Sequence, residues 1–260
     1  MQAGGSGGLA LLAAGGAAGF GLVSCWRSLP GPRADAASAP PEEDAEGSVV
    51  GAYTVAVGSQ RITLPLMKIA PDLAISLLMT IDEPIAFIDT AGAELADALL
   101  QLGTAVDASG VGIEVVVTAA TLGIPVGSAV AKTLGHSRQV VLQKTEKKHL
   151  ADALVEPLAS ITSHGKQQLR LDRRWVPLLK GKRVAFVDDV ISSGGSCIAA
   201  LNLIRAAGGD VVAIGAILVE GDSWKRKLGV DASMVVALGQ IPLFKPAAGG
   251  RGWVEDWRKT

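Results

Sequence analysis

Apolar runs of strand length alternate with segments of helical periodicity over the middle of the chain, and this alternation restricts the fold more than any other feature. The expected strands cover residues 113–118, 139–143, 183–187 and 211–219, and the expected helices cover residues 124–134 and 195–207. A glycine follows each helix, as is common where helices end. Strands that are joined by helices run parallel, so the sequence predicts an α/β fold with an open, mainly parallel sheet flanked by helices.

The residues on either side of this alternation predict further elements. Residues 49–57 and 60–67 alternate between apolar and polar side chains and indicate a β-hairpin that turns at Gly58 and Ser59. Residues 71–79 are interpreted as a short helix, and Thr90 as the cap of a helix that runs to residue 102. Residues 235–237 indicate one more strand.

The strongest indication of function lies in residues 184–196, which read Val-Ala-Phe-Val-Asp-Asp-Val-Ile-Ser-Ser-Gly-Gly-Ser. The first of them predict a buried strand that ends in two adjacent acids, Asp188 and Asp189. Acids at the carboxyl end of a strand can bind sugar hydroxyls or a hydrated metal ion. The Ser- and Gly-rich loop that follows opens a helix, and its N–H groups, hydroxyls and positive dipole end suit a phosphate. Together these features predict a site for ribose 5-phosphate.

Charge and cysteine usage narrow the classes of protein to which the chain can belong. The formal net charge is −1, so nothing indicates nucleic-acid binding through a basic surface. Cys25 and Cys197 lie far apart in the sequence and form no zinc-ligand or disulfide pattern. This usage fits a reducing compartment, and a cytoplasmic protein is therefore expected.

The first 48 residues differ in composition from the rest and are expected to form a disordered, flexible extension to a domain that spans residues 49–260. Residues 1–26 are rich in Gly and Ala and carry no charged side chain, whereas residues 28–49 contain four prolines and an acidic cluster. The apolar run 9–23 is short for a membrane span, and no Lys or Arg precedes it as in a signal peptide. No membrane association is therefore expected; the alternative is a segment that directs the protein to an organelle or a membrane.

Residues 184–196 closely resemble the phosphoribosyl-pyrophosphate (PRPP) signature of type I phosphoribosyltransferases, in which four apolar residues, two acids and a small Ser/Thr/Gly run follow one another. The resemblance extends over roughly residues 60–245 and is greatest to the adenine and xanthine branch of that family. The glycine spacing of residues 123–135, the strand end at Lys144 and residues 163–169 around Lys166 all have counterparts in that branch. The resemblance implies a small hood beside the sheet, to which residues 61–68 and 241–244 are expected to contribute.

The resemblance also implies a reaction and a set of site residues. Members of the family transfer ribose 5-phosphate from PRPP to a base and release pyrophosphate with the help of Mg²⁺, so PRPP and a purine-like base are the expected partners and a homodimer is the expected assembly. Asp188 and Asp189 are expected to hold the ribose hydroxyls, directly or through metal-bound water. The expected residues around the 5-phosphate are Val190, Ile191, Ser192, Ser193, Gly194, Gly195 and Ser196. The expected residues around the pyrophosphate are Ala120, Thr121, Leu122, Gly123, Lys144 and Lys166.

Three positions depart from the family pattern. Leu122 stands where the adenine branch has an arginine, Ser163 where its flexible loop has an acid, and Ser192 where the hypoxanthine–guanine branch has an acid. His164 then becomes the candidate acid and base for the proton of the substrate base; the alternative is an exposed histidine with no part in the reaction. Two functions stay open: purine phosphoribosyl transfer, and binding of PRPP by a non-catalytic regulatory protein.

Overall fold

The computed structural model describes residues 45–102, 108, 110, 112–158, 167–249 and 252–257. All of them belong to one compact unit, Glu42–Thr260. Most of the expected N-terminal extension lies outside the described residues. None of the described helices combines the length and the apolar character that crossing a bilayer requires.

The predicted parallel α/β sheet is confirmed. In the described part of the chain it has five strands in the order β10–β9–β8–β4–β5, and every neighbouring pair in it is parallel. The strands are β4 (Val115–Ala119), β5 (Val140–Leu142), β8 (Arg183–Ile191), β9 (Asp210–Glu220) and β10 (Val235–Ile241). Because the strands are parallel, their carboxyl ends meet at one edge of the sheet, where sites are usually found in such folds.

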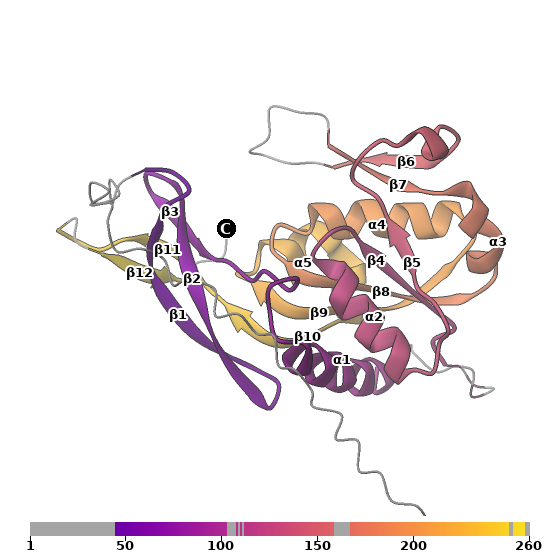
Figure 1. Ribbon diagram of the computed structural model, residues 1–260, viewed down its shortest axis with the longest axis horizontal. Helices are drawn as coiled ribbons and strands as arrows, with labels where there is room; N and C mark the ends of the chain where they lie inside the picture. The colour runs from indigo at the N-terminus through magenta and orange to yellow at the C-terminus, as the bar shows by residue number, and fades with distance from the viewer. Residues whose placement is uncertain are drawn as a thin grey trace, which may run out of the picture. The chain divides into compact units, whose positions relative to one another are not determined.

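Helices bury both faces of this core sheet (Figure 1). Successive residues of β8 point to opposite faces, as the period of a strand requires. Ala185 and Val187 pack in the cluster formed with α1 (Ile85–Leu100) and α2 (Gly123–Thr133). Val184 and Phe186 pack in the cluster formed with α4 (Gly195–Ala206). The near-continuous apolar runs in the sequence therefore reflect strands that are covered on both sides.

A second, antiparallel sheet forms the expected hood. Its strand order is β1–β2–β3–β11–β12, and its members are β1 (Val49–Val57), β2 (Gln60–Ala70), β3 (Leu73–Ser76), β11 (Leu243–Pro246) and β12 (Trp253–Asp256). The predicted hairpin between β1 and β2 is confirmed, and its turn is held against the core. The Gly58 N–H donates to the Leu238 carbonyl of β10 at 2.9 Å, and the Ser59 N–H donates to the Glu94 carboxylate of α1.

The remaining elements lie around α4 and the end of β9. Strands β6 (Leu154–Pro157) and β7 (Gln168–Leu171) pair as an antiparallel arm, and the fully buried Leu169 and Leu171 pack in the same cluster as α4. Short helices follow at α3 (Val176–Leu179) and α5 (Ser223–Leu228). Short 3₁₀ helices cover Lys148–Leu150, Arg173–Trp175 and Gly229–Met234.

Two predicted helices are wrong in type or extent. Residues 71–79 contain strand β3, because Ala74 and Ser76 are buried between β2 and β11 and pairing on both sides overrides the local preference. Helix α1 begins at Ile85, five residues before the predicted cap. Pro84 precedes it with a φ of −55°, and Thr90 lies exposed within the helix. The strand predicted at 235–237 is confirmed and continues to Ile241.

Candidate functional site

Most of the described residues that the sequence singled out meet at the carboxyl edge of the core sheet. Asp188 and Asp189 are close to the end of β8, the loop 120–122 follows β4, and Lys144 follows β5. Burial raises the pKa of both aspartates, and the positive charge of the exposed Lys144 opposes the increase, so Lys144 lies near enough to act on them. His164 and Lys166 lie outside the described residues, and their proposed roles stay predictions.

Two adjacent carboxylates lie within β8. The strand was predicted to end at them, but it continues through Val190 to Ile191 because these residues still pair with β9. Asp188 is 7 % exposed, and its Oδ1 accepts a hydrogen bond from the Asp189 N–H at 3.1 Å. Burial raises the pKa of Asp188 well above its usual range, and the negative charge of Asp189 adds to the increase. Burial also raises the pKa of Asp189. Ionisation of both acids is therefore costly, and either the hydroxyls of a sugar or a cation would stabilise the charged pair.

The phosphate loop, residues 192–194, connects β8 to the first turn of α4. Gly194 has a φ of 78° and directly precedes the helix, so the loop enters α4 through a left-handed residue. The hollow above it has a volume of about 90 Å³ and is lined by Asp188 and by residues 190–197. The N–H groups in the first turn of a twelve-residue helix lack partners within the helix, which makes this hollow suitable for a phosphate; that of Gly195 donates to Ser193 Oγ at 3.5 Å.

A second loop, residues 120–122, leads from β4 into α2 and contains a cis peptide bond between Ala120 and Thr121. The Ala120 N–H donates to the Leu142 carbonyl of β5 at 2.9 Å. The hydroxyl of Thr80 donates to the Leu122 carbonyl. These two hydrogen bonds hold the loop at both ends, so it presents a fixed backbone at the same edge as the aspartates.

Gly123 brings this second loop against the acid pair. A Cβ atom at this position would lie 2.4 Å from Thr118 Oγ1 and 2.5 Å from Asp188 Oδ1. Both distances are too short for any side chain, so only glycine allows α2 to begin this close to β8. The two loops and the two acids thus form one site.

The chemistry of the acid pair suits Mg²⁺, which the family resemblance implies. Mg²⁺ is usually bound by one or two carboxylates together with water and substrate phosphates. Two adjacent carboxylates, the buried Asp188 and the half-buried Asp189, provide such a donor set, because a cation would offset their repulsion. In the described part of the chain no cluster of three or more His, Cys, Asp or Glu residues could hold a metal ion by itself. The residues therefore fit a metal ion that binds together with its phosphate ligand.

Sequence reasoning missed Glu220, the last residue of β9. It is 6 % exposed, and its Oε2 accepts a hydrogen bond from Ser192 Oγ at 2.5 Å. Burial raises the pKa of the Glu220 carboxyl, and the hydrogen bond from Ser192 opposes the increase. The signal was present in the sequence, because a single acid that ends a long apolar strand occupies the same kind of position as Asp188.

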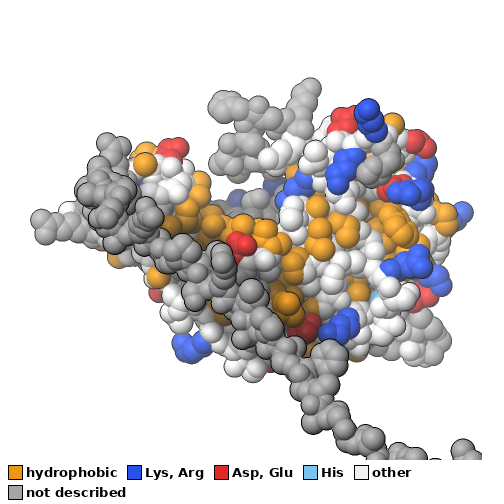
Figure 2. All heavy atoms as spheres, in the orientation of Figure 1, with side chains coloured by type: hydrophobic (Ala, Val, Ile, Leu, Met, Phe, Trp, Pro, Cys, Tyr) orange, Lys and Arg blue, Asp and Glu red, His pale blue; other side chains and the backbone are white. Residues whose placement is uncertain are grey.

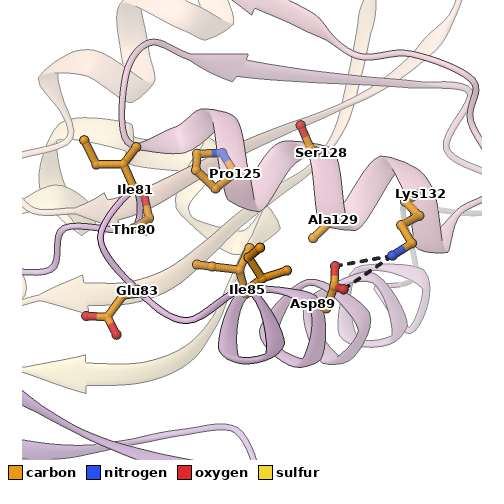
Figure 3. A pocket seen from close by; sticks show the side chains of 10 residues that line it. Thr80, Ile81, Glu83, Ile85, Asp89, Pro125, Ser128, Ala129 and Lys132 are labelled. Atoms are coloured by element: carbon orange, nitrogen blue, oxygen red, sulfur yellow. Dashed lines mark hydrogen bonds and ion pairs between the residues drawn. The ribbon is translucent and has the colours of Figure 1, made fainter. Parts of the chain in front are cut away.

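A larger hollow lies beside the site, between α1 and α2 (Figure 3). Its volume is about 380 Å³, and it is bordered by the exposed side chains of Ile81 and Ile85 and by the ion pair of Asp89 with Lys132. Helices α1 and α2 face the viewer in Figures 1 and 2, and hydrophobic side chains lie among charged ones on this face. Thr80 borders this hollow and also holds the Leu122 carbonyl, so the hollow adjoins the second loop.

Comparison with protein families gives one match over most of the chain. Residues 78–240 match the model of the phosphoribosyl transferase domain. The similar curated proteins include a hypoxanthine/guanine phosphoribosyltransferase of Methanococcus voltae, 31 % identical over 129 residues, and an orotate phosphoribosyltransferase of Staphylococcus saprophyticus, 34 % identical over 109 residues. These matches cover 48 % and 42 % of this chain, and 65 % and 44 % of the two relatives. The matched region is thus less than two thirds of the length of either relative.

Solved structures share the fold. An adenine phosphoribosyltransferase from Thermoanaerobacter pseudethanolicus matches with a TM-score of 0.52 and 20 % identity, and the match covers 68 % of this chain and 95 % of that chain. An adenine phosphoribosyltransferase from Giardia lamblia, solved in complex with 9-deazaadenine, also has a TM-score of 0.52 and 20 % identity, over 73 % of this chain and 93 % of that one. The resemblance to type I phosphoribosyltransferases is confirmed in sequence and in fold.

Proposed function

This chain belongs to the phosphoribosyl transferase domain family, and we propose that it transfers ribose 5-phosphate from PRPP to a purine-type base with release of pyrophosphate. The observation that carries the proposal is the meeting of the acid pair with the phosphate loop at one sheet edge. Ribose hydroxyls and a 5-phosphate are separated by about one sugar ring, and the hollow lined by Asp188 and residues 190–197 offers partners for both.

Each group at the site would have a distinct role. Asp188 and Asp189 accept hydrogen bonds from the ribose hydroxyls, and the N–H groups at the start of α4 donate to the 5-phosphate. The backbone of residues 120–123 and the charge of Lys144 hold the pyrophosphate and stabilise the negative charge that develops as it leaves. Mg²⁺, when bound, would supply further electrostatic stabilisation of the pyrophosphate.

A purine acceptor is favoured by two kinds of similarity. The structures that share the fold include adenine phosphoribosyltransferases, and the sequence relatives include hypoxanthine/guanine as well as orotate enzymes. His164 remains the proposed acid and base for the proton of the acceptor, at a position outside the described residues. The protein is proposed to act as a cytoplasmic homodimer.

The proposal is tested by incubating the purified protein with PRPP, Mg²⁺ and each of adenine, hypoxanthine, guanine, xanthine and orotate in turn. We expect one of the purines to yield its nucleoside monophosphate and pyrophosphate in equal amounts. Omission of PRPP is the control for contaminating nucleotides. Formation of orotidine monophosphate alone would contradict the purine assignment. Binding of PRPP without turnover of any base would favour the non-catalytic regulatory protein.

A further inference from the structure

The phosphate loop is supported from behind by the end of β9 and the start of α5. Ser192, its first residue, donates from Oγ to the Glu220 carboxylate at 2.5 Å. A Cβ atom on Gly194, its last residue, would lie 3.4 Å from Trp224 Cα, so the loop backbone also packs directly on α5. Both ends of the loop therefore rest on the same connection between β9 and α5.

Hydrogen bonds to β10 and within the β9–α5 connection fix the backbone around Glu220 and Trp224. Glu220 pairs with Ile241 in the register of β9 and β10, and the Gly221 N–H donates to the Ile241 carbonyl at 3.0 Å. The Trp224 indole donates to the Gly221 carbonyl at 3.1 Å and is 6 % exposed. The backbone that carries Glu220 is therefore fixed, and its carboxylate already accepts the hydrogen bond from Ser192.

The contact also determines what the Ser192 hydroxyl can do. A serine hydroxyl has one proton to donate, and here that proton is directed at Glu220. It is then unavailable to a phosphate, although the sequence alone predicted that Ser192 would bind one. A buried carboxylate that lacks a hydrogen-bond donor costs folding free energy. The hydrogen bond from Ser192 therefore also stabilises the buried Glu220 carboxylate.

We propose that Glu220 is a positioning residue of the phosphate loop: its carboxylate holds Ser192 and thereby orients the N–H groups of the loop and the hydroxyls of Ser193 and Ser196 toward the 5-phosphate. Glu220 acts through Ser192 and has no contact with the ligand. This inference deepens the proposed function and rests on it, because it requires the loop to bind the phosphate of ribose 5-phosphate.

A double-mutant cycle on Ser192 and Glu220 separates positioning from direct binding. The full-length variants are Glu220→Ala, Ser192→Ala, the double variant and Glu220→Gln, and calorimetry measures their affinity for ribose 5-phosphate. We expect each alanine variant to lose about 10- to 100-fold, the double variant to lose no more than either single one, and Glu220→Gln to stay within about threefold of the unmodified protein. The amide oxygen of glutamine can still accept from Ser192, so this conservative variant reports whether the contact matters.

Asp210→Ala, at the exposed opposite end of β9, is the matched control and should bind normally. Thermal unfolding of every variant shows whether it is folded. The inference is overturned if Glu220→Ala binds ribose 5-phosphate normally, or if the losses at the two positions multiply in the double variant, as they would if Ser192 bound the phosphate itself. If the unmodified protein binds neither ribose 5-phosphate nor PRPP, the proposed function fails and this inference fails with it.

Discussion

Replacement of both Asp188 and Asp189 by asparagine is expected to abolish PRPP binding while the protein stays folded. The carboxylates are the expected acceptors for the ribose hydroxyls and the expected ligands for Mg²⁺. The uncharged amides of asparagine accept hydrogen bonds and bind Mg²⁺ more weakly. Hydrogen bonds to charged groups contribute about 1.5–3 kcal/mol each, so loss of two of them should weaken binding by at least about 100-fold. Calorimetric titration of the double variant with PRPP in the presence of Mg²⁺ measures this loss.

The stability of the same variant provides its control. Burial and mutual repulsion raise the pKa of Asp188, so the ionised pair costs folding free energy at neutral pH. The neutral amides of the double variant carry no such cost, and its melting temperature should equal or exceed that of the unmodified protein. Unchanged PRPP affinity in a folded variant would show that the acid pair is not part of the binding site.

Gly123→Ala is expected to have the largest effect of any single-methyl change near the site. The new Cβ would lie 2.4 Å from Thr118 Oγ1 and 2.5 Å from Asp188 Oδ1. Thr118 is fully buried and Asp188 nearly so, so neither can move aside, and the start of α2 must shift instead. Overpacking of this kind costs about 1–3 kcal/mol of stability. We expect a similar loss of PRPP affinity, about 10-fold or more, because the second loop moves with α2.

Gly51→Ala is the matched control for this substitution. Gly51 lies on β1 of the hood, where a Cβ would meet only the end of the flexible Leu66 side chain, at 3.4 Å. Thermal unfolding and PRPP titration of both variants should show a loss for Gly123→Ala alone. Equal behaviour of the two variants would mean that the close approach of α2 to the acid pair is unimportant.

The parallel sheet and the phosphate loop could be predicted from the sequence because their signals are local. Strands that are covered on both faces give unbroken apolar runs. The run at 113–118 is followed by a glycine-bounded helix, and the run at 183–187 by the acids Asp188 and Asp189. The turn at Gly58 and Ser59 could also be predicted, because the segments on either side of this Gly-Ser pair alternate between apolar and polar residues. These features depend on residues that are close together in the chain.

The errors arose where distant residues decide the structure. Residues 73–76 are a strand because β2 and β11 pair with them, and β11 lies about 170 residues further along the chain. Helix α1 begins directly after a turn at residues 80–83 and Pro84, so its start does not depend on the capping preference of Thr90.

The hydrogen bonds within the site could not be predicted from the sequence either, because they join residues that are far apart in the chain. Ser192 was predicted as a phosphate donor from its place in the motif, but its hydrogen bond to Glu220 spans 28 residues. The same holds for Thr80, which reaches the Leu122 carbonyl 42 residues away. The motif indicated the loops that we propose form the site, whereas the residues that hold those loops in place became visible only in three dimensions.

Titration of the unmodified protein with PRPP in the presence of Mg²⁺ tests the central claim most directly. We expect saturable binding of one PRPP per site with a dissociation constant between about 1 μM and 1 mM, the range in which enzymes usually bind their substrates. Ribose 5-phosphate should compete for the same site with lower affinity, since it lacks the pyrophosphate that faces Lys144 and the second loop. Absence of PRPP binding, or binding that ribose 5-phosphate does not displace, would contradict the assignment of this sheet edge as a PRPP site.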